Sequence, residues 1–417
     1  MLDIKFIREN PDTVKKSIKD RGLDIDLDNI LNLDADRRKV LVEVEGLKAE
    51  KNRVTKQGKP TPDIIVKMKS ISQKILDLDT KVDGIDSKLM SLMLNIPNIT
   101  HKSIPVGSPK HNKIVRRWGE MRKFDFKPKN HIELGEKLNI LDFPRSSKIS
   151  GSGFCVFKGL GAQLERALIN FMLELHTKEH NYKEIFPPFL VNRDSMTGTG
   201  QLPKLEEDMY RLRDDDLFLV PTAEVPLTNL HRDEVIDESE LPIYYTAYTA
   251  CFRREAGSYG KDTKGLMRVH QFDKVELVKF VRPDSSYDEL ETLLGNAEEV
   301  LRRLGLPYRV VMLSTQDISF AASKCYDIEA WAPGIEKNLE VSSCSNFTDF
   351  QARRANIKYR LKSKKKLEFV HTLNGSGIAM ARTVIAILEN YQEKDGSIII
   401  PDVLRPYMSG REKITRS

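Results

Sequence analysis

The stretch CFRREAGSYGKDTKGLMRVHQFDKVE, residues 251–276, decides the fold. Two apolar-to-basic passages flank a middle rich in Gly, Ser, Lys and Asp, a pattern typical of a strand, a long loop and a second strand. Because side chains alternate between the faces of a strand, one face of the second passage carries Arg268, His270, Phe272, Lys274 and Glu276. Two interpretations are open at this point: the floor of a site for a charged planar ligand such as a nucleotide, or the exposed face of an antiparallel hairpin.

Composition limits the class of protein. The 417 residues, 40% hydrophobic and 31% charged, predict two or three domains with a sizeable core and long solvated helices. A net charge of +6 permits contact with a polyanion without requiring it. The four cysteines are widely separated and no Cys/His cluster has zinc-ligand spacing, so we expect reduced thiols in a cytoplasmic protein and no zinc. No long apolar run suggests a membrane span or a secretion signal.

Two heptad patterns occupy the N-terminal quarter. Leu33, Val40, Leu47 and Val54 recur every seven residues, and a Gly/Pro-containing break follows at 57–62. The second pattern is spaced 4,3,4,3 and consists of Ile64, Met68, Ile71, Ile75, Leu78, Val82, Ile85, Leu89 and Leu92. Such a pair predicts an antiparallel helical hairpin at about 28–94. It could be a spacer or a dimerisation coil. We favour a probe for a large partner, because its Lys and Arg side chains suit nucleic-acid phosphates: Lys48, Lys51, Arg53, Lys56, Lys59, Lys67, Lys69 and Lys74.

The remainder predicts an α+β domain. A short helix is expected within 1–26, and prolines with polar clusters mark 95–150 as a linker with a domain boundary near 100–110. Further along we expect an amphipathic helix at 159–180, a proline-broken strand at 182–191, a strand, turn and helix at 217–231, strands at 306–312, 324–331 and 339–343, and a helix at 384–392. No βαβ repeat, GxGxxG or GxxxxGK[ST] occurs, which argues against a doubly wound nucleotide fold or a P-loop.

Three segments carry a resemblance to a known family. EIFPPFLV, residues 184–191, resembles motif 1 of the class II aminoacyl-tRNA synthetases. Residues 252–276 resemble motif 2, and HTLNGSGIAMARTVIAILENYQ, residues 371–392, resembles motif 3. PTAEVPL at 221–227 and the segment 340–360 narrow the resemblance to the bacterial-type seryl-tRNA synthetase family, essentially end to end. It implies an α+β fold: the class II antiparallel sheet of six or seven strands with flanking helices, plus an N-terminal antiparallel coiled-coil arm.

The resemblance also implies an activity and a domain plan. Members activate L-serine with ATP, giving seryl-adenylate and pyrophosphate, and then transfer serine to the 3′-terminal adenosine of tRNA(Ser); whether tRNA(Sec) is also served stays open. A tRNA-binding domain with the arm is expected at 1–105 and a catalytic domain at 106–417. A homodimer, with motif 1 at its interface, and a cytoplasmic location are implied as well, and no contact with membranes is expected.

The resemblance also implies which residues bind ATP. Arg253 matches the motif 2 arginine at the α-phosphate and substrate carboxylate, and Arg382 the motif 3 arginine at the γ-phosphate; these two are the expected catalytic residues. The full ATP-binding set implied is Arg253, Arg254, Glu255, Arg268, Val269, Phe272, Glu340, Val341, Ser342, Ser343 and Arg382. Mg²⁺ is the implied cofactor, with Glu340 and Ser343 as its protein ligands. Arg254 stands where the family commonly has a small residue, and strand alternation would turn it away from ATP.

The resemblance implies a second set of residues, which would bind L-serine: Thr222, Ala223, Glu224, Arg253, Glu276, Asn374 and Ser376. Hydrogen bonds to the substrate hydroxyl would reject alanine. Which carboxylate holds the serine ammonium stays open. Thr222 could alternatively be only a helix N-cap. The attacking carboxylate is already ionised at neutral pH, so His270 and His371 are not expected to act as bases.

Two other functions remain as alternatives. A synthetase-like ligase that loads a small amino acid onto a carrier protein would share the catalytic motifs but lack the long arm. A non-enzymatic coiled-coil RNA-binding protein would keep the arm without Arg253, Phe272, Glu340 and Arg382. The presence of both the arm and these residues argues against each alternative.

Overall fold

The protein is described here by a computed structural model that covers residues 1–56, 61–256, 264–362 and 366–416. Its chain forms two compact units, Met1–Pro97 and Asn98–Ser417. Within the described ranges, no helix is long and apolar enough to cross a membrane.

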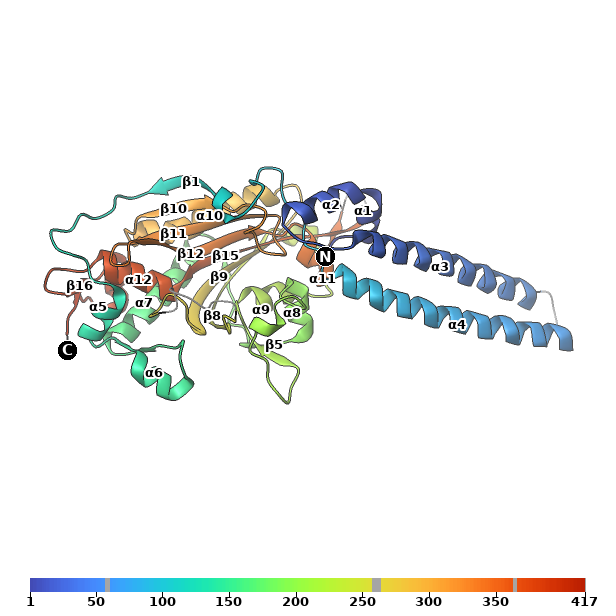
Figure 1. Cartoon of the computed structure of the whole chain (residues 1–417), viewed down its shortest axis with the longest axis horizontal. Coiled ribbons are helices and arrows are strands. Elements are labelled where there is room, and N and C mark those ends of the chain that lie inside the picture. Colours follow the sequence, from blue (N-terminus) through green and yellow to red (C-terminus); the bar gives the residue numbers. More distant parts are fainter. Residues whose placement is uncertain (57–60, 257–263, 363–365, 417) are drawn as a thin grey trace. The chain divides into compact units, whose positions relative to one another are not determined.

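The first unit is dominated by two long antiparallel helices, α3 (Leu27–Thr55) and α4 (Pro62–Met93), shown in Figure 1. Asp26 accepts a hydrogen bond from the Asn29 amide and Thr61 one from the Ile64 amide, so each helix begins at a side-chain cap. Val40, Val44 and Val82 form the buried centre of the pair. The predicted helical hairpin is confirmed; most of its expected turn, residues 57–60, lies outside the described residues.

Ion pairs link the two arm helices. Three of them join a lysine to an acid across the hairpin: Lys48–Asp79 at 3.3 Å, Lys67–Glu50 at 2.7 Å and Lys74–Glu43 at 2.7 Å. These pairs are exposed, and each contributes about 0–1 kcal/mol. Three lysines predicted to suit phosphates therefore already have acidic partners, which a stronger polyanion could displace.

The start of the chain differs from the prediction. Two helices precede the arm, α1 (Ile4–Glu9) and α2 (Pro11–Asp20), where the sequence predicted one. Asp3 caps α1 by accepting from the Lys5 amide. Pro11 occupies the first position of α2, where its missing N–H costs nothing and where the preceding helix must end.

The second unit is built on an eight-stranded sheet with the order β1-β10-β11-β12-β15-β9-β8-β4 (Figure 1). The strands are β1 (Lys113–Trp118), β10 (Tyr308–Met312), β11 (Lys324–Ala332), β12 (Lys337–Asn346), β15 (His371–Ala379), β9 (Gln271–Val281), β8 (Ile243–Phe252) and β4 (Lys183–Glu184). All neighbours are antiparallel except β4 and β8, which are parallel. The expected class II sheet is present, with more strands than predicted.

Residues 95–150 are not merely a linker. They contain β1, which is an edge strand of the main sheet, and α5 (His131–Lys137), which begins with a capping box between Asn130 and Glu133. Two more short elements follow, β2 (Leu141–Asp142) and α6 (Phe143–Ser150). The prolines and charges that suggested a linker are those of an exposed edge strand and its connections.

Helices cover the sheet on both faces. One face packs against α7 (Leu160–Lys178), α10 (Ser286–Arg303) and α12 (Met380–Asn390) around the largest apolar core. The other face packs against α9 (Glu224–Asn229) and α11 (Phe350–Arg354). Strand β9 shows the alternation: Val275 and Leu277 belong to the first core, whereas Val278 and Phe280 belong to the second.

Smaller elements complete the second unit. They are β3 (Val156–Phe157), β5 (Leu190–Asn192), α8 (Arg193–Thr199), β6 (Leu217–Leu219), β7 (Val235–Asp237), β13 (Lys358–Leu361), β14 (Lys366–Phe369), β16 (Ile398–Ile399) and β17 (Lys413–Ile414), with 3-10 turns at Pro109–His111, Glu206–Asp208, Glu238–Glu240 and Asp402–Met408. The predicted break in 182–191 is confirmed, because β4 ends before the two prolines and β5 begins after them.

Candidate functional site

A cavity of about 490 Å³ lies in the second unit, on the face of the sheet that α9 and α11 cover in part. Residues of β9, β12 and β15, the start of α12 and the segments 199–209 and 266–269 line it. It brings together most of the residues predicted from the sequence: Thr222, Glu224, Arg253, Glu255, Arg268, Val269, Phe272, Glu340, Val341, Ser342, Ser343, Asn374, Ser376 and Arg382.

The strands of motif 2 differ from the predicted ones. Strand β8 ends at Phe252 and β9 begins at Gln271, so Arg253, Glu255 and Arg268 lie on the connecting segments. Glu255 has a φ of 51°, a left-handed turn that ends the strand alternation. Of the five residues on the face marked by the alternation, Arg268, Phe272 and Lys274 line the cavity, whereas Glu276 lies outside its lining. His270 lies outside it as well: its ring stacks on Phe154, and its Nδ1 lies 2.7 Å from the Tyr210 hydroxyl.

Cations and an aromatic ring meet on one side of the cavity. The Arg253 guanidinium lies 5.4 Å from the centroid of the Phe272 ring, and its Nε donates to the Pro221 carbonyl at 3.2 Å. Arg268 pairs with Glu255 at 2.9 Å, which joins the two segments that flank the loop. Arg382 donates from Nη1 to the Glu340 carbonyl at 2.8 Å. This side presents three guanidinium groups around a planar ring.

A bulge in β12 brings Glu340 and Ser343 into the same cavity. Residues three apart in a regular strand face opposite sides of the sheet. Here Glu329 pairs with Glu340 and Ile328 with Ser342, so Val341 is an extra residue that restores a common face. Behind Ser343 lies Asp327, whose pKa is raised well above its usual range by burial and by the nearby charge of Glu340.

A buried polar network forms the other side. Lys274 and Glu276, on β9, form an ion pair. The Lys274 ammonium donates to the Thr222 hydroxyl at 2.8 Å, and that hydroxyl donates to Glu276 Oε2 at 3.1 Å. Asn374 Nδ2 donates to Glu276 Oε1 at 3.0 Å. Glu276 is fully buried, so this network keeps its charge satisfied beneath the cavity floor.

Glu224 occupies a different environment. Its Oε1 accepts from Gln351 Nε2 at 2.6 Å, and Gln351 is itself fixed by the Thr372 hydroxyl at 2.7 Å and the Thr199 carbonyl at 3.1 Å. Burial, and then the negative charge of Glu276, raise the pKa of Glu224 to about 7, against the opposing effect of the Gln351 hydrogen bond. The more distant charges of Lys274 and Arg253 lower this pKa in part, and its direct hydrogen bond comes from the neutral Gln351.

Three predicted residues take other places in the described structure. Ala223 is fully buried and belongs to the core beneath α9. Arg254 lies outside the cavity lining, and its amide donates to the Asp208 carbonyl at 2.8 Å. Glu276 lies beneath the cavity lining and contacts three residues that belong to it, Lys274, Thr222 and Asn374. The interpretation of Thr222 as the helix N-cap was wrong, because α9 begins at Glu224 and its N-cap is Ala223; the Thr222 hydroxyl still accepts from the Glu224 amide at 3.3 Å.

Two site residues were missed from the sequence. Lys274 lies on the strand face that the alternation had marked, so the signal for it was present. Gln351 lies on α11 and donates to Glu224 on α9. This is a tertiary contact, which no local sequence pattern predicts. Residues 257–263, most of the long loop predicted between the two strands, lie outside the described residues.

Comparisons with known proteins agree in both units. The family described as "Seryl-tRNA synthetase N-terminal domain" matches residues 1–100, and "tRNA synthetase class II core domain (G, H, P, S and T)" matches residues 206–391. A serine–tRNA ligase of Carboxydothermus hydrogenoformans is 58% identical over 416 residues, 98% of either chain. One of Geotalea uraniireducens is 56% identical over 99% of this chain and 100% of its own.

Solved structures are similar over the whole chain. A seryl-tRNA synthetase from Pyrococcus horikoshii, crystallised with ATP, matches with a TM-score of 0.93 and 39% identity and covers 100% of both chains. A cytoplasmic serine–tRNA ligase from Naegleria fowleri, in complex with AMP, matches with a TM-score of 0.90 and 32% identity over 100% of this chain and 99% of its own.

Proposed function

We infer the roles of the site residues from one premise: the chain belongs to the seryl-tRNA synthetase family of class II aminoacyl-tRNA synthetases and is a serine–tRNA ligase (EC 6.1.1.11). The observation that supports the assignment of roles is that one cavity has three guanidinium groups on one side, with Glu224 lining the other side and Glu276 beneath it. We propose that ATP occupies the first side and serine the second.

The first step needs charge and position rather than a base. A serine carboxylate oxygen forms a bond to the α-phosphorus of ATP, the bond to the β-phosphate oxygen breaks, and pyrophosphate leaves. Arg253 contacts the α-phosphate and the serine carboxylate from its place between the two sides. Its guanidinium stays charged and can bind paired oxygens, so it stabilises the negative charge of the transition state.

Adenine stacks on Phe272, with its amino group at Glu255. Arg268 and Arg382 contact the outer phosphates. In the structure Glu255 and Arg268 pair with each other across the base of the loop, so a nucleotide would exchange this exposed ion pair for contacts of its own. An exposed pair of this kind contributes about 0–1 kcal/mol, a small cost for that exchange.

Glu340 and Ser343 fit a magnesium site. They supply a carboxylate and a hydroxyl on one face of β12, and oxygen donors are what Mg²⁺ prefers. No group of three or more His, Cys, Asp or Glu suited to a metal occurs among the described residues, so substrate phosphates and water must complete the shell. A bound Mg²⁺ supplies positive charge to the phosphates. Asp327 pairs with Ser343 across the strands, and burial and the charge of Glu340 raise its pKa.

We assign the serine ammonium to Glu224. Glu276 already has Lys274 as its cation and two further donors, whereas Glu224 accepts from the neutral Gln351. The ammonium would supply the missing charge and lower the pKa of Glu224. Asn374 and Ser376, neighbours on β15, are then placed for the serine hydroxyl. An alanine substrate would leave such groups unpaired.

The second step moves serine from the adenylate to tRNA. A hydroxyl of the terminal ribose attacks the carbonyl carbon and AMP leaves. We propose that residues 1–105 bind tRNA(Ser) through the arm and that 106–417 form the catalytic domain. We also propose a cytoplasmic homodimer with motif 1 at its interface; the exposed Phe186 and Leu190 of that motif support an interface there.

Serine-dependent ATP–pyrophosphate exchange, followed by charging of tRNA with radiolabelled serine, tests this proposal. We expect both, and Arg253→Ala should reduce exchange by about 100-fold or more, as expected for a group that stabilises transition-state charge. Exchange without charging would favour loading of a carrier protein. Absence of exchange in the wild-type protein would refute the assignment of the cavity.

A further inference from the structure

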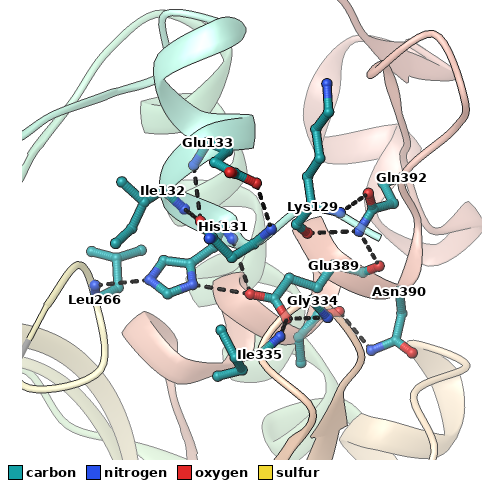
Figure 2. A network of polar contacts seen from close by, with 12 residues as sticks. Lys129, His131, Ile132, Glu133, Leu266, Gly334, Ile335, Glu389, Asn390 and Gln392 are labelled. Atoms are coloured by element: carbon teal, nitrogen blue, oxygen red, sulfur yellow. Dashed lines mark hydrogen bonds and ion pairs between the residues drawn. The ribbon is translucent and has the colours of Figure 1, made fainter. Parts of the chain in front are cut away.

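A buried carboxylate lies behind the nucleotide side of the cavity. Glu389, near the end of α12, is fully buried and accepts four N–H hydrogen bonds (Figure 2). Oε1 accepts from the His131 amide at 2.9 Å and from His131 Nδ1 at 3.0 Å; Oε2 accepts from the amides of Gly334 at 2.9 Å and Ile335 at 3.2 Å. Both oxygens of Glu389 therefore act as acceptors, and each has two N–H donors.

These bonds determine the tautomer of His131. Its Nε2 lies 3.2 Å from the amide nitrogen of Leu266 (Figure 2). A backbone amide can only donate, so Nε2 must accept and carries no proton. The proton therefore resides on Nδ1, where Glu389 accepts it. Glu389 thus turns the Nε2 lone pair of a buried, neutral ring toward Leu266.

Leu266 begins the segment that carries Arg268 into the cavity. Leu266, Met267 and Arg268 all contribute to the lining. The Met267 carbonyl accepts from Arg382 Nε at 3.3 Å. Arg382 and Glu389 are seven residues apart on α12, two turns along one side of the helix. Helix α12 therefore holds this segment twice, directly through Arg382 and indirectly through His131.

Two glycines allow the backbone to approach closely in this region: Gly265 next to His131 and Gly334 next to Lys129. Gly265 has a φ of +70°, and a Cβ there would lie 2.3 Å from His131 Nε2. A Cβ on Gly334 would lie 2.2 Å from the Lys129 carbonyl oxygen. Gln392 fixes Lys129 at the entrance to α5, accepting from its amide at 2.8 Å and donating to its carbonyl at 2.9 Å (Figure 2). The segments 129–131, 265–266 and 334–335 and helix α12 thus meet around Glu389 and His131.

We propose that His131 and Glu389 are positioning residues for nucleotide binding. They hold the segment 266–268 at a fixed distance from α12, so that Arg268 and Arg382 reach the phosphates of one ATP molecule together. His131 touches no reacting atom and transfers no proton. This inference rests on the proposed placement of ATP, and it predicts an effect on ATP rather than on serine, whose residues lie on the opposite side of the cavity.

Two substitutions of His131 separate positioning from stability. In His131→Asn the amide can still bond to Glu389 but is too short to reach Leu266. In His131→Gln the side-chain oxygen can take the place of Nε2. We expect His131→Asn to raise the KM for ATP in pyrophosphate exchange about tenfold, or about 1.4 kcal/mol, with the serine KM within about twofold. His131→Gln should recover part of the loss, because it restores the acceptor for the Leu266 amide but not the side-chain donor to Glu389.

Asn390→Ala is the matched control, because Asn390 follows Glu389 on α12 and donates to the Trp331 carbonyl at 2.7 Å but takes no part in the chain to Leu266. It should lower thermal stability without changing the ATP KM. Glu389→Gln should raise the ATP KM, and adding His131→Asn should raise it little further, since both act through one bond.

Equal ATP KM values for wild type, His131→Asn and His131→Gln would overturn the inference, as would equal rises in the ATP and serine KM. Arg268→Ala distinguishes the failures. If Arg268→Ala raises the ATP KM and His131→Asn does not, only the positioning role of His131 is rejected. If Arg268→Ala leaves the ATP KM unchanged, the proposed placement of ATP is rejected, and the positioning role is rejected with it.

Discussion

Glu224 and Glu276 lie in the same site, yet their surroundings give them different properties. Lys274, Thr222 and Asn374 satisfy Glu276, whereas burial and the charge of Glu276 hold the pKa of Glu224 near 7. The motifs predicted both carboxylates but left their roles open. Their roles depend on neighbours from other strands and helices, and a sequence does not state those contacts.

The raised pKa of Glu224 predicts how serine binding depends on pH. The serine ammonium binds the ionised carboxylate, so below pH about 7 binding must first release a proton. The serine KM in pyrophosphate exchange should therefore rise as pH falls through about 7, by up to about tenfold per unit. Glu224→Gln should raise the serine KM at pH 8 and remove most of this dependence. A steep profile retained in the variant would assign the titration to another group.

Gln351 offers a second test at this scale. Its hydrogen bond opposes the rise in the pKa of Glu224, so Gln351→Leu should raise that pKa further and move the serine KM profile to higher pH. The buried Thr372 hydroxyl would also lose its acceptor, at a cost of about 1–3 kcal/mol in the free energy of unfolding. The measurements are the serine KM against pH and denaturant unfolding. A profile that stays in place despite lower stability would contradict the role of Gln351.

At the scale of elements, the regular patterns were predictable and the irregular ones were not. The seven-residue repeat predicted α3, and the 4,3 spacing predicted α4, each within a few residues. Period two correctly placed Phe272 and Lys274 on the cavity face of β9, but it failed at the left-handed turn of Glu255 and could not reveal the extra residue Val341 in β12. Bulges and strand ends follow from pairing with neighbouring strands, which are distant in sequence.

The β12 bulge predicts a specific metal dependence. Glu340→Gln should raise the Mg²⁺ concentration for half-maximal exchange by about tenfold or more, because a carboxylate ligand is lost. Glu329→Gln is the control: Glu329 pairs with Glu340 across the strands but is bound to Arg309 at 2.6 Å and lies outside the cavity lining. The same Mg²⁺ requirement in both variants and the wild type would exclude Glu340 as a ligand.

At the scale of the whole molecule, the chain forms two compact units. Met1–Pro97 contains the helical arm, and Asn98–Ser417 contains the complete cavity. The sequence predicted domains at 1–105 and 106–417 from the change from heptads to mixed patterns, whereas the compact units divide after Pro97. It did not predict that β1 and α5 belong to the catalytic sheet and its support, since both were hidden in a stretch with the composition of a linker.

The central claim is that serine activation belongs to the cavity and tRNA selection to the arm. It is tested most directly by replacing residues 40–80 with a short Gly/Ser linker and measuring exchange and tRNA charging in parallel. The arm helices pack mainly on each other, so the shortened protein should keep exchange within about twofold and lose charging by about 100-fold or more, since its phosphate contacts are removed. Equal loss of both activities, or normal charging, would contradict the account.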